Sequence, residues 1–441
     1  MCGIFAIYSE KNTNDNLVEL INGMINLQHR GKDGYGFSIY SSDNVISTTK
    51  NQGEIDINLK NIEKKCKSCV GHMRYSTSGL SIKSGKTQYN EIQPLIGKKN
   101  NINYVLCHNG NIPNIKKHDT TYINEKIMNN NNSIENNLIN IMNEIPAAFS
   151  IVILINNNLY IMRDRYGIRP LCIGEKNNNY YVSSESVGFN NNINYVRDVK
   201  PGEIIKINEN GINTLYVHPD AKLGLCLFEI LYFLNENSFT DGLYIKNIRK
   251  HLGKLIAIKD KNYFSKNDYT VVGIPLTGIC SGKSYAKHMN FNYKQLIRKN
   301  TNCSRSFIAI TDKERKNICK NKFIYDGKNI KDKKIIVVDD TIVRGNVIKS
   351  IINNLYKFGA KEVHVRIPAP PVIDICELGI CIQSKTELIM NNKSINEVCK
   401  EINANSLKYL LLNELQNIPK YSYNQCFSGY IDEAIKSYKQ N

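Results

Sequence analysis

Residues 333–355 read KKIIVVDDTIVRGNVIKSIINNL, and this stretch determines how the second half of the chain folds. An apolar run ends at Val338 and is followed by two acidic residues, Asp339 and Asp340. The loop that comes next contains Thr341, Arg344, Gly345 and Asn346. Apolar residues then recur at helical spacing up to Leu355,. A strand, a loop and a helix N-terminus in this order direct backbone N–H groups and the helix dipole at one point, which predicts a phosphate site.

The two acids at the end of the strand extend this prediction. Adjacent carboxylates can bind ribose hydroxyls and Mg²⁺, which prefers oxygen ligands. A second stretch, VVGIPLTGICSGKSYA from Val271, has the same strand–loop–helix form, and its Thr277, Gly278 and nearby amides could hold a pyrophosphate. The alternative for both stretches is a strand that ends in an ordinary polar turn.

The patterns on either side predict two domains. Beyond about residue 220, strands such as EVHVRI (362–367) alternate with helical patterns, which is typical of a parallel α/β sheet,. Before it, short apolar segments broken by Asn-rich turns indicate β-structure, with one helix expected over 16–27,. We therefore expect domains at 1–220 and 221–441, which suits a chain of 441 residues,.

Composition narrows the functional classes. The net charge of +18 could indicate nucleic-acid binding, but the basic residues form no block, and the chain is rich in Lys, Asn, Ile and Tyr and lacks Trp,. Codons rich in A and T explain that bias, so we expect no specific nucleic-acid partner. The apolar run AAFSIVILI from Ala147 is much shorter than the ~20 residues of a membrane span,. We expect a cytoplasmic protein without a membrane partner.

The start of the chain, MCGIF, places Cys2 directly after the initiator methionine. We expect maturation to remove Met1 and nothing more, because no secretory signal or propeptide is recognisable,. Cys2 would then carry a thiol and a free α-amine on one Cα, which is a nucleophile with its own base. Thirteen cysteines, an odd number with irregular spacing, indicate free thiols, catalytic groups or metal ligands rather than a disulfide framework,.

Several motifs together resemble known families. VVDDTIVRG resembles the signature of type I phosphoribosyltransferases, which bind phosphoribosyl pyrophosphate (PRPP). In the first half MCGIF, LQHRGKDGYG (from Leu27), GHMRYSTSG (from Gly71) and HNGN (from His108) resemble class II glutamine amidotransferases. In this order and nearly end to end, the chain is similar to the amidophosphoribosyltransferase family.

The resemblance implies a fold and an activity. The fold would be an α+β N-terminal nucleophile hydrolase domain, an αββα sandwich, followed by an α/β parallel-sheet phosphoribosyltransferase domain. The reaction would convert glutamine, PRPP and water to 5-phosphoribosylamine, pyrophosphate and glutamate, the first step of de novo purine synthesis. Ammonia would pass between the two sites by an internal path. Purine nucleotides as inhibitors and a homo-oligomer are also implied.

The resemblance also assigns residues to roles. Cys2 would be the nucleophile of the glutaminase, with Asn109 and Gly110 as the oxyanion hole. Arg74 would bind the α-carboxylate of glutamine and Asp119 its α-amine. Asp339 and Asp340 would bind the ribose and face Mg²⁺. The remaining PRPP ligands would be Thr341, Arg344, Gly345, Asn346, Thr277 and Gly278, with Lys299 and Arg305 on a loop over the pyrophosphate.

Three departures from the family pattern open an alternative. The phosphate loop has Asn346 and Val347 where two threonines are usual. The pyrophosphate loop has Gly273 and Leu276 where proline and an acid are usual, and Thr301 stands where an arginine is usual. A regulatory or degenerate homologue, with glutaminase or ligand binding but without PRPP turnover, would also fit. Glucosamine-6-phosphate synthase shares the Cys2-type half but lacks the VVDDTIVRG loop.

Some members of the family hold a [4Fe–4S] cluster on four cysteines. Cys226, Cys376 and Cys426 fall at three of the four ligand positions, and Tyr423 stands at the fourth. Cys381 is near in sequence and is a candidate to complete the set. The expected cofactors are thus Mg²⁺ and, if a fourth ligand is supplied, an iron–sulfur cluster.

Overall fold

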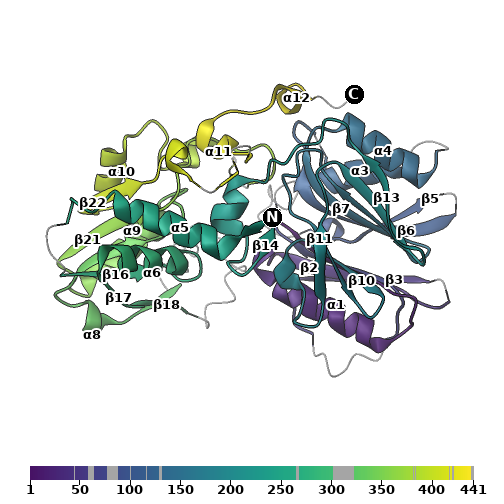
Figure 1. The fold of residues 1–441 in the computed structure, drawn as a ribbon, viewed down its shortest axis with the longest axis horizontal. Coiled ribbons are helices and arrows are strands. Elements are labelled where there is room, and N and C mark those ends of the chain that lie inside the picture. The colour runs from purple at the N-terminus through teal and green to yellow at the C-terminus, as the bar shows by residue number, and fades with distance from the viewer. Residues whose placement is uncertain are drawn as a thin grey trace.

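The computed structural model describes residues 1–441 except 44, 58–63, 77–87, 100, 116, 129–131, 265–267, 301–321, 381, 383, 417, 420–421 and 439–441. The predictions for Thr301, Arg305 and Cys381 lie outside these described residues. The two halves of the chain lie side by side, and the N-terminus lies between them (Figure 1).

The first half contains two antiparallel sheets. The strands of the first sheet are β1 (Gly3–Tyr8), β2 (Gly34–Tyr40), β3 (Ile46–Gln52), β4 (Cys69–Arg74), β9 (Cys172–Lys176), β10 (Asn179–Ser183) and β11 (Asn194–Asp198). The strands of the second are β5 (Leu95–Lys99), β6 (Ile102–Asn111), β7 (Ala148–Ile155), β8 (Asn158–Arg163), β12 (Glu203–Asn208) and β13 (Gly211–Val217). Their orders are β11-β9-β10-β1-β4-β2-β3 and β13-β12-β8-β7-β6-β5.

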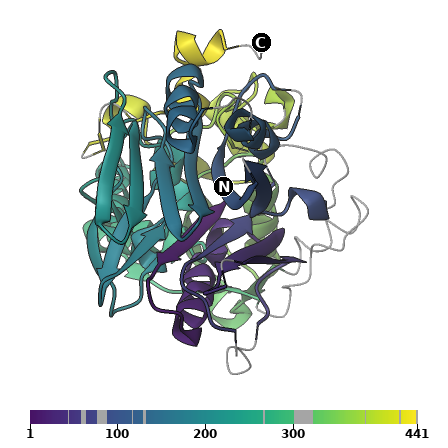
Figure 2. The same ribbon diagram turned by 90° about the vertical axis from the view of Figure 1, so that its right-hand side faces the viewer.

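Helices cover the outer face of each sheet. α1 (Asn14–Asn26) lies on the first sheet, and α3 (Asp119–Met128) and α4 (Ile134–Glu144) lie on the second (Figures 1 and 2). Alternation along β1 explains the layers, because Ile4 and Ala6 face the second sheet whereas Phe5 faces α1,. This arrangement confirms the predicted αββα sandwich, and α1 confirms the helix expected over 16–27.

The second half is built on a parallel sheet of order β17-β16-β20-β21-β22. Its strands are β16 (Tyr269–Gly273), β17 (Asn292–Tyr293), β20 (Lys334–Val338), β21 (Glu362–Ile367) and β22 (Ser406–Tyr409). Two small ribbons pair β14 (Phe239–Thr240) with β15 (Leu243–Tyr244) and β18 (Ile297–Lys299) with β19 (Phe323–Tyr325). The parallel sheet confirms the predicted α/β fold.

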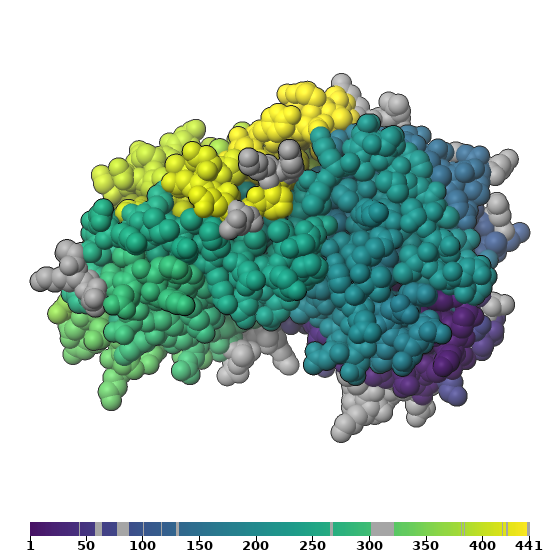
Figure 3. All heavy atoms as spheres, in the orientation of Figure 1, coloured from purple at the N-terminus to yellow at the C-terminus, as the bar shows by residue number. Residues whose placement is uncertain are grey.

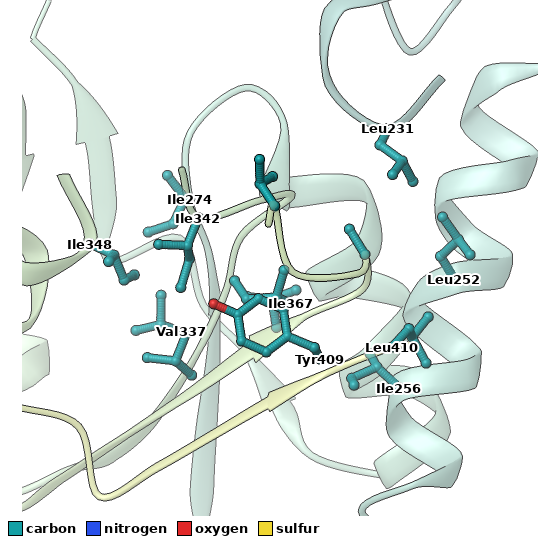
Figure 4. Close-up of a cluster of buried hydrophobic side chains, with 14 of the residues drawn as sticks. Leu231, Leu252, Ile256, Ile274, Val337, Ile342, Ile348, Ile367, Tyr409 and Leu410 are labelled. Atoms are coloured by element: carbon teal, nitrogen blue, oxygen red, sulfur yellow. The ribbon is translucent and has the colours of Figure 1, made fainter. Parts of the chain in front are cut away.

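The second half also contains helices. They are α5 (Ile245–Ile258), α6 (Gly278–Met289), α8 (Gly327–Ile330), α9 (Asn346–Lys357), α10 (Ile395–Glu401), α11 (Gln425–Ser428) and α12 (Glu433–Lys436). A π-helix spans Glu229–Phe233. Short 3-10 helices span Gln28–Arg30, Tyr89–Glu91, Ser186–Gly188, Lys385–Glu387 and Leu412–Glu414. Val337, Ile348 and Ile367 show how the apolar sides of strands and helices meet in one core (Figure 4).

The last described residues return to the first half (Figures 1 and 3). The Asn114 side chain donates a hydrogen bond to the carbonyl of Tyr438 over 2.9 Å, and the hydroxyls of Tyr122 and Tyr438 lie 3.0 Å apart. Among the described residues, no helix is long and apolar enough to span a bilayer.

Candidate active sites

Cys2 lies at the centre of the first site, just before β1. Its thiol is buried, and Sγ accepts a hydrogen bond from the Tyr75 N–H over 3.4 Å. The Arg30 guanidinium donates from Nε to the Cys2 carbonyl over 2.8 Å. The thiol and the carbonyl of the predicted nucleophile are therefore both held by residues of motifs that the sequence had singled out.

Met1 occupies the space beside Cys2. Its side chain is buried, and the Arg169 guanidinium contacts its Sδ. Burial, helped by the charges of Arg30 and Arg169 and opposed by Cys2 and Glu229, lowers the pKa of the Met1 α-amine to about 4. An amine in this environment is neutral at physiological pH, as a base must be.

We expect the mature protein to lack Met1, so that the α-amine of Cys2 itself lies in this environment. Intact-protein mass spectrometry would show a mass lower by one methionine residue and no acetyl group. A retained Met1, or an acetylated N-terminus, in fully active protein would contradict the role of the Cys2 amine as base.

Asn109 and Gly110 lie on β6, paired with Ser150 and Phe149 of β7. The Asn109 side chain is 1 % exposed, and its Nδ2 has no hydrogen-bond partner in the described part of the chain. A buried amide nitrogen without an acceptor is costly unless a ligand supplies one. At Gly110 a Cβ would lie 2.0 Å from the Ala148 carbonyl oxygen, so only glycine fits.

Gln93 holds the backbone next to this pair, and sequence reasoning missed it. Its Oε1 accepts from the His108 N–H over 2.6 Å, and its Nε2 donates to the His108 carbonyl over 3.1 Å. The side chain of His108 is buried, and burial lowers its pKa to about 4. The imidazole is thus neutral beside the unpartnered Asn109 amide.

Arg74, the predicted carboxylate-binding residue, is paired with a residue that the sequence did not reveal. Its Nη2 donates to the Glu91 carboxylate over 2.7 Å and its Nη1 to the Glu91 carbonyl over 2.9 Å. Both side chains are nearly buried. A ligand carboxylate would therefore have to share or displace this ion pair to reach Arg74.

The structure brings Asp119 close to Arg74 through His118, a second residue that was missed. His118 Nε2 lies 3.3 Å from Arg74 Nη1 and 3.7 Å from Asp119 Oδ1. Asp119 is buried at the first position of α3 and also accepts from the Thr120 N–H over 2.8 Å. The His118 imidazole thus bridges a cation and an anion, the two charges that the predicted roles of Arg74 and Asp119 need.

The second site is formed by Asp339 and Asp340 at the carboxyl end of β20. Both side chains are buried, and Asp340 accepts hydrogen bonds from the hydroxyls of Thr277 over 2.6 Å and Thr341 over 3.0 Å. Burial and the neighbouring Asp340 raise the pKa of Asp339 well above its usual value. Two crowded carboxylates of this kind fit a divalent cation, which would relieve their repulsion.

Two glycines allow backbone to approach this site. Gly345 caps α9 with φ of 77°, and a Cβ there would lie 2.2 Å from the Ile389 Cδ1. Gly278 opens α6, and a Cβ there would lie 2.3 Å from the Val338 carbonyl oxygen. The predicted phosphate loop and pyrophosphate loop thus both end at helix N-termini, next to the acid pair.

Two of the predicted basic ligands, Arg344 and Lys299, are exposed on the surface. Arg344 is exposed and donates from Nε to the Glu387 carboxylate over 2.7 Å. Lys299 is at the end of β18, where burial lowers its pKa and Lys32 and Glu54 of the first half influence it. Arg305 belongs to the same predicted loop as Lys299 but is not among the described residues.

The π-helix Glu229–Phe233 lies between the two sites. The rings of Phe233 and Tyr75 are 5.9 Å apart, and Tyr75 contacts the Cys2 thiol. Burial and then the charge of Asp340 raise the pKa of Tyr232, although 40% of this residue is exposed. One short element therefore connects the surroundings of Cys2 with those of Asp340.

The three cysteines predicted as cluster ligands come together around Tyr423. Burial and the proximity of Cys226 raise the pKa of Cys376 to about 12, and burial, Cys376 and Cys226 raise that of Cys426. The backbones of Cys226 and Tyr423 pair, and the Tyr423 hydroxyl donates to Gln425 over 2.6 Å. In the described part of the chain no group of three or more His, Cys, Asp or Glu residues could hold a metal ion.

Comparisons with protein families match both halves. A glutamine amidotransferase domain matches residues 79–191, and a phosphoribosyl transferase domain matches residues 241–369. An amidophosphoribosyltransferase of Methanocaldococcus jannaschii is 32% identical, covering 94% of this chain and 93% of the relative. One of Bacillus subtilis is 29% identical over 93% and 87%.

A solved structure agrees with the fold. The B. subtilis glutamine PRPP amidotransferase complexed with ADP and GMP superposes with a TM-score of 0.84. It is 27% identical and covers 97% of both chains. Both halves of this chain, in the same order, are thus similar to one known architecture.

Proposed function

Because this chain belongs to the amidophosphoribosyltransferase family, we propose that it releases ammonia from glutamine at Cys2 and transfers it to PRPP at the Asp339–Asp340 site. The reaction is the glutamine-dependent synthesis of 5-phosphoribosylamine in purine biosynthesis. The observation that carries this proposal is that the π-helix Glu229–Phe233 packs Phe233 against Tyr75, which contacts the Cys2 thiol, while the charges of Asp340 and Asp339 act on its Tyr232. The comparisons give no support to a purely regulatory homologue.

In the first half-reaction the α-amine of mature Cys2 accepts the thiol proton, and Sγ attacks the side-chain amide carbon of glutamine. Charge that develops on the amide oxygen is stabilised by Asn109 Nδ2 and the Gly110 N–H. The unpartnered Asn109 amide supports this role. Arg74 and Asp119 orient the substrate by its α-carboxylate and α-amine.

Ammonia released at Cys2 then has to reach PRPP without being protonated. The rings of Tyr75 and Phe233 lie 5.9 Å apart beside Cys2, and we place the start of the ammonia route at this pair. Aromatic walls exclude water and so keep the nitrogen as neutral, nucleophilic ammonia. At the second site ammonia attacks C1 of PRPP, and pyrophosphate leaves.

At the second site Asp339 and Asp340 would hold the ribose hydroxyls and a Mg²⁺ ion. When bound, Mg²⁺ would supply charge neutralisation for the leaving pyrophosphate. The amides at the start of α9, with Thr341, would bind the 5′-phosphate, and those at the start of α6, with Thr277, the pyrophosphate. Leu276, where the family usually has an acid, is 66% exposed with φ of 82°, so its side chain does not fill this site.

The experiment that tests this function measures pyrophosphate release by the purified protein with Mg²⁺ and PRPP. We expect release with glutamine or with ammonia, and none when PRPP or both nitrogen sources are omitted. Isotope-labelled glutamine should deliver its amide nitrogen to the phosphoribosyl product. Glutaminase activity without any consumption of PRPP would show that the altered loops are inactive and would favour the regulatory alternative.

We propose further that the domains divide at 220/221, that purine nucleotides inhibit the enzyme, and that it is a cytoplasmic homo-oligomer. Support for nucleotide binding comes from the B. subtilis structure, which holds ADP and GMP. Free thiols at ten described cysteines are compatible with a reducing compartment,.

We expect the protein to contain no iron–sulfur cluster. The described residues offer three buried thiols and a phenol, whereas a [4Fe–4S] cluster usually takes four thiolates,. Protein purified under anaerobic conditions should be colourless, iron-free by elemental analysis and active. A brown protein with about four iron atoms per chain would show that Cys381 or another ligand completes the set.

A further inference from the structure

A buried ionic cluster joins the two halves of the chain beside Cys2. Arg30, Arg169 and Glu185 come from the first half and Glu229 from the second, and all four side chains are at most 1% exposed. Arg30 Nη2 donates to Glu229 over 2.9 Å, and Arg169 Nη1 donates to the same carboxylate over 3.4 Å. Charges buried this deeply are stable only when they are paired.

The cluster reaches the nucleophile through one guanidinium group. While Arg30 Nη1 and Nη2 contact Glu185 and Glu229, its Nε donates to the Cys2 carbonyl over 2.8 Å. The guanidinium is planar and rigid, so the Glu185 and Glu229 carboxylates together determine the orientation of the edge that holds Cys2, and Glu229 is the contribution of the second half,.

The segment that carries Glu229 is held by hydrogen bonds from both halves of the chain. Glu185 of the first half accepts from the Asn235 N–H over 2.8 Å and from the Ser238 hydroxyl over 2.6 Å. Within the second half, Arg249 of α5 donates to the carbonyls of Ile230 and Leu234 over 3.1 and 2.7 Å. Glu229 therefore projects from a segment that is itself well fixed.

We propose that Glu229 is a positioning residue of the glutaminase, supplied by the phosphoribosyltransferase half. Its carboxylate aligns Arg30, and Arg30 aligns Cys2 with the oxyanion site at Asn109. The glutaminase is then fully competent only when the two halves are docked. This inference rests on the proposed function, because it assigns a role relative to Cys2 as nucleophile.

The test is Glu229→Gln, which keeps the shape and removes the charge. We expect glutamine-dependent kcat to fall about 10- to 100-fold, the scale expected for a displaced reacting group. The KM for glutamine should stay near wild type, because Arg74 and Asp119 are untouched. Ammonia-dependent pyrophosphate release should stay within about twofold of wild type, because the acid pair remains. Covalent labelling of Cys2 by a diazo-ketone analogue of glutamine should slow in parallel with the glutamine-dependent kcat.

A matched control is Glu236→Gln, an acid of the same segment that is partly exposed and paired with Lys246 over 3.4 Å. It should change none of these values. If Glu229→Gln does not fold, Glu229→Asp keeps the charge and retracts the carboxylate, and the same selective loss is expected.

Two outcomes would overturn the inference. One is unchanged glutamine-dependent activity in a folded Glu229 variant. The other is an equal fall of glutamine- and ammonia-dependent activity, which would make Glu229 only a structural residue. Failure of the proposed function is distinguishable, because then the wild-type protein itself would show no glutamine-dependent release.

Discussion

Replacing Cys2 with alanine is expected to abolish glutamine-dependent synthesis and to leave ammonia-dependent synthesis intact. The thiol is the group that would attack the amide, and none of the other described cysteines contacts the Tyr75 N–H. Loss of a catalytic nucleophile costs on the order of 10⁶-fold in kcat. Pyrophosphate release with glutamine or with ammonium chloride as the nitrogen source measures both activities on one sample.

Cys172→Ala is the matched control for this experiment. Cys172 is also a buried thiol of the first half, but it lies on β9 and donates to the Ser183 carbonyl over 3.3 Å. Its variant should retain both activities. If Cys2→Ala keeps glutamine-dependent release, or loses the ammonia-dependent activity as well, the assignment of separate sites is wrong.

The local patterns of the sequence predicted the sheets and the parts of each site that are contiguous in the chain. The strand–acid–loop–helix order around Asp339 is confirmed as β20, a loop and α9, since this backbone geometry follows from neighbouring residues, whereas phosphate binding there stays a prediction,. The roles of Asn109 and Gly110 came from the family resemblance and not from local spacing, and they stay a prediction that the lack of room for a Cβ at Gly110 supports.

The residues that the sequence did not reveal act across the fold. Glu91 and His118 reach Arg74 only because β4, the 3-10 turn before β5 and the start of α3 meet at one corner. Glu229 meets Arg30 across 199 positions of sequence. An isolated glutamate carries no sign of such a partner, because its pairing depends on tertiary packing and not on local spacing.

The Arg74–Glu91 pair has a consequence for substrate binding. A buried ion pair is strongly coupled, and removing one partner leaves an uncompensated charge. The Glu91 carboxylate and the α-carboxylate of glutamine would both favour the same guanidinium. With Arg74 in its proposed role, affinity for glutamine would depend on the difference between two similar interactions and would be weaker than an arginine without Glu91 would provide.

Replacing Asp339 and Asp340 together with asparagine is expected to abolish synthesis from either nitrogen source. Asparagine keeps the shape but removes the charge that would bind Mg²⁺ and orient the ribose. Positioning and electrostatic effects of this kind are worth about 10³-fold or more. A slow glutaminase should survive, because Cys2, Arg74 and Asn109 remain. Pyrophosphate release and glutamate formation, assayed side by side, separate the two effects.

Stability distinguishes loss of chemistry from loss of fold in this variant. The pKa of Asp339 is raised by burial and by Asp340, so the folded protein binds that proton more tightly than the unfolded chain. Ionisation of Asp339 therefore reduces stability as the pH rises from the pKa of the unfolded chain toward that of the folded protein. Removing this charge should increase the free energy of unfolding at neutral pH.

Asp332→Asn, at an exposed turn before β20 with φ of 62°, is the control and should change neither activity nor stability,. An inactive variant that is as stable as wild type or more so, measured by thermal unfolding without Mg²⁺, would locate the loss in the PRPP site, whereas wild-type pyrophosphate release would show that the acid pair does not bind PRPP.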